Sequence, residues 1–521
     1  MKGSTLKNAV EAHGWIGVIL SVPLFIVFWT GSVTLFYPEL SRWATLPLTP
    51  QTSVDHQGPR LGPLLAEKLQ GLPLRPESRF SLTLAGESSP LLKLYVPLDK
   101  SKSTTGEDHA HLLIDPSTGK TIAEDDPFQF AYFIYALHYN LKLPQGLYIV
   151  GVVTLFFLVM LMTGLVIQFR ILLRDFFHYR HDKGPRMRAH DLHTIAGVMT
   201  LPFATMYALT GLMLNLGVLF YAPTIMLAYA GDESAMMTEV GFARPQRKLT
   251  GRTFPTPDLN LLIAQVEEQH SAKIFRLSFQ NYGDESAFIR MSSLTNHGFG
   301  RRKDFYYEVG TGTFPVEFNS NEPHIFRDGV TSLDALHMGK FGGPGVRFLF
   351  FVLGVGVCAM IVFGNILWLA KRETKLREYK NTIALIRSLT IGGCTGTVVA
   401  TFLGFTLERL LPLQLPARSE IVEVVFVLML SSSVIAGFFV KHVTKFLAYS
   451  AYLSAALLSL LIVSDLALVG PQLFALPPSH RDALPVTLGL TLSTALLVWL
   501  GRGVLRSSAW ATRPNKRSAG Q

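Results

Sequence analysis

The chain has 521 residues, of which 49% are hydrophobic and only 16% are charged, whereas a soluble protein carries about a quarter charged residues. The net charge of +10 does not indicate a nucleic-acid partner, because the basic residues cluster at the ends of apolar runs. Both cysteines, Cys358 and Cys394, lie inside apolar runs. This excludes a disulfide framework, a Cys-x-x-Cys redox pair, covalent haem attachment through Cys-x-x-Cys-His and four-thiolate iron–sulfur ligation.

Eight segments are apolar and long enough to cross a lipid bilayer, which takes about 20 residues of helix. We expect the first segment to be retained as a span, because no small-residue cleavage site follows it. The fold class is therefore an all-α polytopic membrane protein. The expected spans cover residues 14–36, 146–169, 193–216, 345–370, 385–408, 420–440, 446–469 and 484–501.

Lys and Arg residues mark every second connection between these spans. Segment 170–188 holds six of them against two acids, and segment 371–380 holds five against two. The positive-inside rule then places these connections and both termini in the cytoplasm. Two long connections, 37–143 and 217–343, are expected to face outward. Their Pro, Gly, Ser and Thr content and short alternating stretches predict a small α+β domain in each.

Comparing the chain with itself reveals a duplication in its first 370 residues. The first span begins HGWIGVILSVPLFIVFWTG at His13, and the third begins HTIAGVMTLPFATMYALTG at His193. The second span follows LHYNLKLPQG, which contains His138, and the fourth follows LHMGKFGGPG, which contains His337. The repeated unit is thus a span, an outer domain, a Leu-His pair and a span. Two halves of equal topology predict a pseudo-twofold axis along the membrane normal.

The last four expected spans do not match this repeat and form an appended module. The predicted organisation has a first span, an outer domain, two spans joined by a basic loop, a second outer domain, a fourth span and a C-terminal module of four spans. These parts cover residues 1–36, 37–143, 144–216, 217–343, 344–372 and 373–521 respectively.

The repeat places equivalent histidines at two depths in the membrane. His13 and His193 lie at the cytoplasmic starts of the first and third spans, while His138 and His337 lie just outside the second and fourth. A twofold axis brings each equivalent pair face to face, and two imidazoles from facing helices form a six-coordinate haem site. The four-span core is therefore predicted to hold two b haems, with iron bound by His13 and His193 at one level and by His138 and His337 at the other.

Other interpretations of these residues stay open at this point. A histidine at a span end also serves as an interfacial residue that caps a helix. His190, three residues before His193, is an alternative inner ligand or a partner for a haem propionate, and His178 is a further possible ligand in the basic loop.

The glycines and basic residues near the spans also have two interpretations. Glycines at equivalent places leave room for a flat macrocycle, but small residues also allow close helix packing without any cofactor. The basic residues are propionate partners or topology signals only. The glycines are Gly14, Gly17, Gly31, Gly197 and Gly211, and the basic residues are Arg170, Arg174, Lys371 and Arg372.

The repeated Leu-His motifs and His-x-x-x-Gly spans resemble those of the PepSY-associated transmembrane proteins, over about residues 10–372. The stretch HLLIDPSTGKTIAEDD, residues 111–126, is similar to the end of a PepSY domain, with a turn at Asp115–Gly119. EVGTGTF at 308–314 is a candidate counterpart in the second outer domain. The resemblance implies two PepSY-like periplasmic domains and a place in the bacterial inner membrane. Similar members include iron-regulated ferrisiderophore reductases, which bind two b haems in the four-span core.

The function implied by this resemblance is ferric reduction across the membrane. Electrons would pass from the cytoplasmic side to ferric iron or a ferric siderophore at the periplasmic domains. No Gly-x-Gly-x-x-Gly follows a strand, so the donor is expected to be quinol or a separate cytoplasmic reductase. The alternatives are a non-enzymatic PepSY-domain scaffold and an iron or siderophore transporter. Transport is disfavoured by the few ionisable residues at mid-membrane, since Glu408 and Glu423 lie near span ends.

Overall fold

Within the residues that it describes, the computed structural model contains eight helices that are long and apolar enough to cross a membrane, as predicted. It describes residues 3–48, 59–75, 77–86, 89–102, 108–169, 178–295, 302–315, 318, 324–372, 380–475 and 483–511. The eight candidate spans are Ser4–Thr34, Gly146–Gln168, Arg186–Leu216, Lys340–Arg372, Asn381–Leu410, Arg418–Phe439, Val443–Leu468 and Pro485–Arg506.

The two repeated halves build a core of four helices. These are α1 (Gly3–Thr34), α5 (Gly146–Gln168), α7 (Pro185–Leu216) and α12 (Gly343–Arg372). α1 and α7 each pack against both α5 and α12, so the four form a closed ring. Their interior is apolar, with Leu24, Phe157, Ala204 and Val357 among the buried side chains that meet there. Repeat-related helices therefore occupy equivalent places around one axis.

The two outer connections form a single sheet. Its order is β4-β3-β2-β1-β5-β6-β7, and all neighbouring pairs are antiparallel. Each half supplies its own strands, and β1 joins β5 through five residue pairs from Arg79 with Gln280 to Thr83 with Arg276. We expected two small domains, and the pairing of β1 with β5 joins their strands across the repeat axis. The strands are β1 Arg79–Thr83, β2 Leu92–Pro97, β3 His109–Ile114, β4 Thr121–Glu124, β5 Ala272–Gln280, β6 Phe288–Thr295 and β7 Arg302–Glu308.

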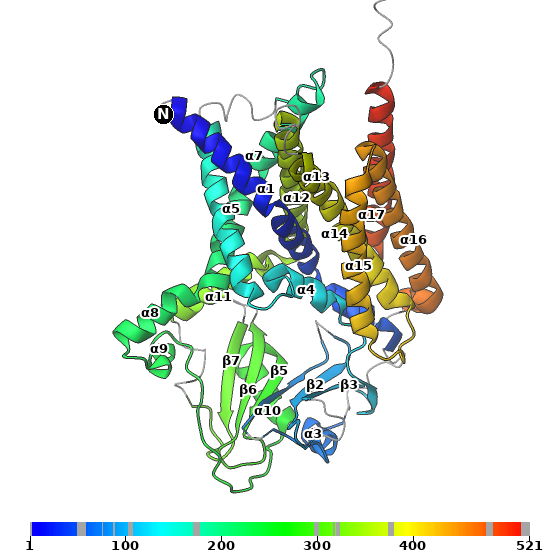
Figure 1. Ribbon diagram of the computed structural model, residues 1–521. Helices are drawn as coiled ribbons and strands as arrows, with labels where there is room; N and C mark the ends of the chain where they lie inside the picture. Colours follow the sequence, from blue (N-terminus) through cyan, green and yellow to red (C-terminus); the bar gives the residue numbers. More distant parts are fainter. Residues whose placement is uncertain are drawn as a thin grey trace, which may run out of the picture.

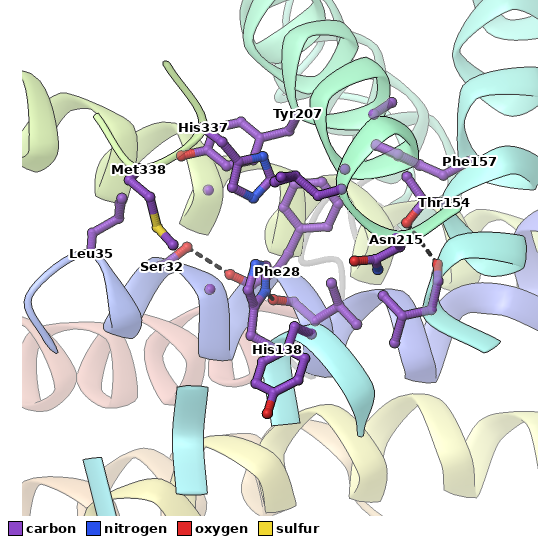
Figure 2. Close-up of a pocket in the computed structure, with 18 of the residues that line it drawn as sticks. Phe28, Ser32, Leu35, His138, Thr154, Phe157, Tyr207, Asn215, His337 and Met338 are labelled. Carbon is purple, nitrogen blue, oxygen red and sulfur yellow. Dashed lines mark hydrogen bonds between the residues drawn. The ribbon is translucent and has the colours of Figure 1, made fainter. Parts of the chain in front are cut away.

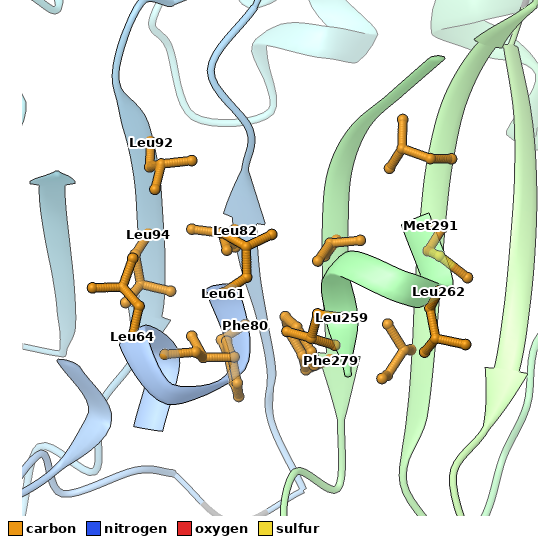
Figure 3. Close-up of a cluster of buried hydrophobic side chains, with 14 of the residues drawn as sticks. Leu61, Leu64, Phe80, Leu82, Leu92, Leu94, Leu259, Leu262, Phe279 and Met291 are labelled. Carbon is orange, nitrogen blue, oxygen red and sulfur yellow. The ribbon is translucent and has the colours of Figure 1, made fainter. Parts of the chain in front are cut away.

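One helix from each half covers the same face of this sheet. Figure 3 shows α3 (Leu61–Leu69) and α10 (Leu259–His270) placing leucines against Phe80 and Phe279, which stack at 4.9 Å between ring centroids. The apolar side chains of the central strands alternate along the chain, as expected for a sheet with one covered face. A helix followed by three strands is thus the unit that both halves repeat.

The turns after β3 and β7 confirm this correspondence at the level of single hydrogen bonds. The amide of Gly119 donates to Asp115 O at 2.9 Å, and the amide of Gly312 donates to Glu308 O at 3.0 Å. Both glycines have positive φ, 71° and 70°, which an L side chain adopts only with strain. EVGTGTF is therefore the structural counterpart of the Asp115 turn.

Two short helices lie across the ends of the spans, between them and the sheet. These are α4 (Phe130–Asn140) and α11 (Ile325–His337), and each carries a predicted ligand in its last turn. In Figure 1 the N-terminus and the end of α17 (Ala483–Ala511) lie at the opposite end of the span bundle from the sheet. This arrangement agrees with an even number of crossings.

The C-terminal module consists of helices α13 to α17, which pack beside the first half of the repeat. α14 contacts α1 and α4, and α17 contacts α2. The equivalent of α2 in the second half, α8, has no buried residue, so the module makes the core asymmetric. The bounds are α2 Tyr37–Thr45, α8 Val218–Ala228, α9 Glu233–Glu239, α13 Lys380–Ser388, α14 Cys394–Leu410, α15 Arg418–Phe439, α16 Val443–Ala475 and α17 Ala483–Ala511.

A buried ionic cluster joins this module to α2. The guanidinium of Arg409 lies 2.7 Å from a carboxylate oxygen of Asp465, and both side chains are at most 3% exposed. Arg409 also donates to Trp43 O at 2.9 Å, and the indole N–H of Trp43 donates to Asp465 at 2.5 Å. The sequence comparison did not single out Asp465, which lies inside the seventh span.

A second set of contacts from the module holds the start of α4. The amide of Phe130, the first residue of that helix, donates to the Glu408 carboxylate at 2.7 Å. Arg418 donates to the carbonyls of Pro127 and Glu408. Because the first amides of a helix have no partner within the helix, a carboxylate at this place stabilises α4. The module therefore fixes the helix that ends at the predicted ligand His138.

Candidate functional site

The outer histidines of the two repeats face each other. His138 is in the last turn of α4 and His337 ends α11. Their ring centroids are 6.0 Å apart, and the ring planes are inclined by 39°. Figure 2 shows the two side chains entering one pocket from different elements. The structure thus brings together two residues that are almost 200 positions apart in the sequence, as the repeat predicted.

Hydrogen bonds determine which ring nitrogen of this pair is free. Nδ1 of His138 lies 2.8 Å from Val27 O, which can only accept, so this nitrogen carries the proton. Nδ1 of His337 lies 2.8 Å from the hydroxyl of Thr210, whose own proton goes to Met206 O at 2.8 Å. Both rings are therefore protonated at Nδ1, and in the described part of the chain no hydrogen bond reaches either Nε2. This is how metal-binding histidines are usually oriented.

Burial keeps both outer imidazoles neutral. It lowers the pKa of His337 to about 3, with a smaller effect from the neighbouring His138. It also lowers the pKa of His138, although the hydrogen bond to Val27 acts in the opposite direction. Neutral imidazole is the form that binds a metal.

A cavity of about 230 Å³ adjoins the outer pair. Its walls come from all four core helices and from α4 and α11, and they are mainly apolar and aromatic. Phe28, Phe157, Phe203, Tyr207 and Phe350 are among the residues that line it. This is the composition expected of a site for a large, flat, apolar cofactor.

The inner histidines form a second facing pair. The ring centroids of His13 and His193 are 6.3 Å apart, with the planes inclined by 75°. Nδ1 of His193 lies 2.8 Å from Met360 O, and Nδ1 of His13 lies 3.1 Å from the hydroxyl of Thr163. That hydroxyl donates within its own helix, so His13 is the donor. Among the described residues the Nε2 atoms of this pair also make no hydrogen bond.

The two pairs are well separated along the membrane normal. His138 packs against Gly31 of α1, 18 residues after His13 in the same helix. At about 1.5 Å per residue this corresponds to about 27 Å along the helix. The pairs therefore lie near opposite faces of the hydrocarbon core, which is about 30 Å thick.

Glycines lie against all four rings. A Cβ added at Gly31 would lie 2.6 Å from His138, and one at Gly211 would lie 3.9 Å from His337. Gly164 and Gly364 play the same part for the inner pair, with Cβ positions 3.3 Å from His13 and 3.0 Å from His193. Three other glycines were also predicted to leave room for a cofactor, but they lie against side chains of neighbouring helices. Gly14 contacts Trp368, Gly17 contacts Met160 and Gly197 contacts Met360.

The sequence comparison missed Gly164 and Gly364 together with the hydrogen-bond partner Thr163. A signal was present, because Gly164 follows His138 by 26 residues and Gly364 follows His337 by 27. Aligning the second and fourth spans with a one-residue shift would have found the two glycines. The carbonyl partners Val27 and Met360 have no signal in the sequence, since every residue carries a carbonyl group.

The remaining candidates lie apart from the two pairs. His190 turns to Asp191, with Nδ1 3.2 Å from the carboxylate, and Arg180 also binds that carboxylate. His178 is exposed. The structure therefore brings His193, and not His190, opposite His13.

The basic residues considered as propionate partners have other roles or lie outside the described residues. Lys371 is 3.3 Å from Glu11, and Arg372 also pairs with Glu11 while stacking on Trp368. These contacts link α12 to α1 at the ends of the spans. Arg170 and Arg174 fall outside the described part of the chain.

Each histidine pair offers two ligands, and in the described residues no group of three or more His, Cys, Asp or Glu side chains is placed to hold a metal ion. A metal bound by two imidazoles needs further ligands from outside the chain, and the four nitrogens of a porphyrin are one such set. Metal–imidazole bonds are about 2 Å long, as at zinc sites. Two such bonds and two ring radii add up to a centroid separation close to the 6.0 and 6.3 Å observed. The two sites therefore fit a haem held by two axial histidines.

Comparison with known proteins places most of the chain in a recognised group. A family model described as the PepSY-associated TM region matches residues 10–371, a range that includes both histidine pairs and ends within α12. An uncharacterized protein of Pseudomonas aeruginosa is 27% identical over 257 residues. The match covers 47% of this chain and 64% of that protein, just under two thirds of its length.

Proposed function

The chain belongs to the family of the PepSY-associated TM region, as its motifs predicted, and from this premise we propose that it is a transmembrane haem b protein that reduces ferric iron. Electrons enter from a cytoplasmic reductase or from quinol and reach ferric iron or a ferric siderophore at the periplasmic sheet. The main support for this proposal is that two histidines face each other at each of two depths. The ring centroids are 6.3 Å apart in the inner pair and 6.0 Å apart in the outer pair. A path across a bilayer needs a cofactor at both depths.

Each residue of the two sites has a defined part in this function. His13 and His193 would hold the inner haem, and His138 and His337 the outer one. The hydrogen bonds to Nδ1 orient the rings and leave Nε2 of each ring as the nitrogen that would bind iron. The haem supplies one-electron redox chemistry that no amino-acid side chain of the core offers.

Reduction of ferric iron serves its release from a chelate. Siderophores bind the ferric ion through hard oxygen ligands, and these hold the softer ferrous ion less well. A protein that delivers an electron at the periplasmic surface thereby frees the metal for uptake.

The first test is the pigment of the purified protein. We expect two noncovalent haems per chain, with absorption bands of bis-imidazole haem b that sharpen on reduction with dithionite. Acid–acetone should extract the pigment, since the chain has no Cys-x-x-Cys-His motif. A ratio near one would remove one pair from the proposal, and a colourless protein purified from haem-replete cells would overturn it.

The second test concerns the sides of the membrane. We propose that the chain resides in the bacterial inner membrane with both termini in the cytoplasm and the sheet in the periplasm, on the basis of the Lys and Arg bias. Alkaline phosphatase fused after Asp115 or after Tyr306 should be active, because it folds only outside the cytoplasm. A fusion after Arg180, in the basic loop, is the matched control and should be inactive. The reverse pattern would contradict the orientation.

A further inference from the structure

The face of the sheet opposite α3 and α10 carries an unusual set of arginines. Strand residues alternate between the two faces, and the neighbours of the buried Phe80, Leu277, Met291 and Phe305 are largely polar or charged. The registers of the central strands bring four arginines onto this face, and we call them the arginine face. They are Arg79 of β1, Arg276 of β5, Arg290 of β6 and Arg302 of β7.

These four arginines make no ion pair within the described residues. Arg276 donates to the hydroxyl of Thr83 at 3.2 Å, and Arg79 donates to the amide oxygen of Gln280 at 3.1 Å. Nε of Arg290 is buried and has no hydrogen-bond partner in the described structure. Two carboxylates of β7 lie on the same face: Asp304 accepts from the hydroxyl of Ser292 at 2.5 Å, and Glu308 lies 3.8 Å from Nε of Arg247.

The arginines also repel one another. Burial lowers the pKa of Arg276, and the positive charges of Arg302 and Arg290 lower it further, while Tyr37 and Asp304 act in the opposite direction. Burial and Arg244 lower the pKa of Arg79 in the same way. Like charges held close together are destabilising, and a bound anion would relieve this repulsion.

The arginine face is connected to the outer histidine pair through two tyrosines. Arg276 lies near Tyr37, at the start of α2. The ring of Tyr37 lies 5.9 Å from that of Tyr135. Tyr135 lines the cavity that also contains His138 and His337. The positive surface thus lies beside the outer end of the proposed electron path.

We propose that the arginine face binds an anionic ferric chelate whose ligands are carboxylates. The planar fork of an arginine pairs with both oxygens of a carboxylate, and such charge-assisted bonds are stronger than neutral ones. Carboxylate oxygens also suit ferric iron, and several of them around one ion leave the chelate negatively charged. A basic surface attracts such a substrate before contact. This proposal rests on the proposed function for the reaction, and it adds the substrate class.

Binding can be measured apart from reduction by using gallium(III) citrate, because gallium does not undergo the reduction that iron does. Isothermal titration of the full-length protein in detergent should show saturable binding that weakens with rising salt. Replacing Arg276→Gln or Arg290→Gln should raise the Kd by about tenfold each, the loss expected of one charge-assisted hydrogen bond. Arg252→Gln is the matched control, since Arg252 is 79% exposed and pairs with Glu285 elsewhere in the same domain. It should leave the Kd unchanged.

Four outcomes separate this proposal from its competitors and from the proposed function. Equal Kd values for wild type and R276Q/R290Q, with both proteins eluting as monodisperse species, would overturn it. The double variant could instead bind gallium citrate as the wild type does but lose haem. This result would show that the arginines pair with the carboxylates of the haem propionates and not with a chelate. A cationic hydroxamate chelate that depends on the arginines as strongly as citrate does would also contradict it. Arginine-dependent citrate binding by a protein without haem would support this inference and overturn the proposed function.

Discussion

Replacing His138 or His337 by alanine is expected to lower the haem content of the purified protein from two per chain to one, and the double replacement should lower it no further. The two rings face each other at 6.0 Å and would bind one iron, so they act as a unit whose effects are not additive. Replacing one member of each pair, as in H13A/H138A, should remove both haems. The measurement is the ratio of extracted haem to protein.

His190→Ala is the matched control, because His190 lies on the same helix as His193 and turns to Asp191 instead of His13. It should keep both haems. If His193→Ala kept both and His190→Ala lost one, His190 would be the inner ligand. If all four single replacements kept full haem, the proposed ligand set would be wrong.

The same variants test the direction of electron flow. Loss of the outer haem should abolish ferric reduction while the inner haem is still reduced by the cytoplasmic donor. Loss of the inner haem should leave the outer one oxidised in the presence of that donor but reducible by dithionite. Equal ferric reduction by all variants would show that iron takes its electron elsewhere.

Replacing Arg409 by methionine is expected to destabilise the protein by about 3–5 kcal/mol, because it leaves the buried carboxylate of Asp465 without its cation. Both side chains are at most 3% exposed, and their oxygen and nitrogen atoms lie 2.7 Å apart. Removing both charges together, as in R409M/D465L, should recover much of the loss, since a buried pair and an apolar pair of similar volume are often close in stability. The measurement is thermal unfolding in detergent.

The exposed pair Lys142–Glu423 provides the control for this cycle. Its atoms are 3.2 Å apart, but the side chains are 38% and 29% exposed. Lys142→Met should therefore change the free energy of unfolding by less than about 1 kcal/mol. Equal effects of Lys142→Met and Arg409→Met would show that the cluster around Asp465 does not hold the module to α2.

The contacts of Glu408 and Arg418 also give the C-terminal module a structural role that the sequence left open. Glu408 accepts from the first amide of α4, and Arg418 donates to the carbonyl of Pro127, just before that helix. α4 ends in the turn that carries His138. The module thus braces the helix that carries His138, while its counterpart α11 packs mainly against α7.

The sequence by itself determined the eight spans and the pairing of the four histidines. Apolar length decides where a helix crosses a bilayer, because no other backbone conformation satisfies its own hydrogen bonds there. A duplicated chain with both halves in one orientation is folded around an axis, so that His13 meets His193 and His138 meets His337. These inferences need only periodicity and symmetry, which local sequence carries.

The joining of the two outer regions was decided only by the tertiary structure. Within its own half, β1 has one unpaired edge, and β5 has one in the other half. These two edges pair with each other across the repeat axis. An unpaired strand edge can pair with another chain and cause aggregation, but the sequence of neither strand specifies which strand will cover it. The arginine face has the same origin, since Arg79 and Arg276 become neighbours only when β1 and β5 pair.

The free nitrogen of each histidine likewise depends on contacts that no motif specifies. The partners of Nδ1 are Val27 O, Met360 O and the hydroxyls of Thr163 and Thr210, which come from helices distant in the chain. The pair Arg409–Asp465 brings together α14 and α16 in the same way. Such contacts are set by how helices pack in three dimensions, because a carbonyl or a hydroxyl becomes a partner only when packing brings it within about 3 Å.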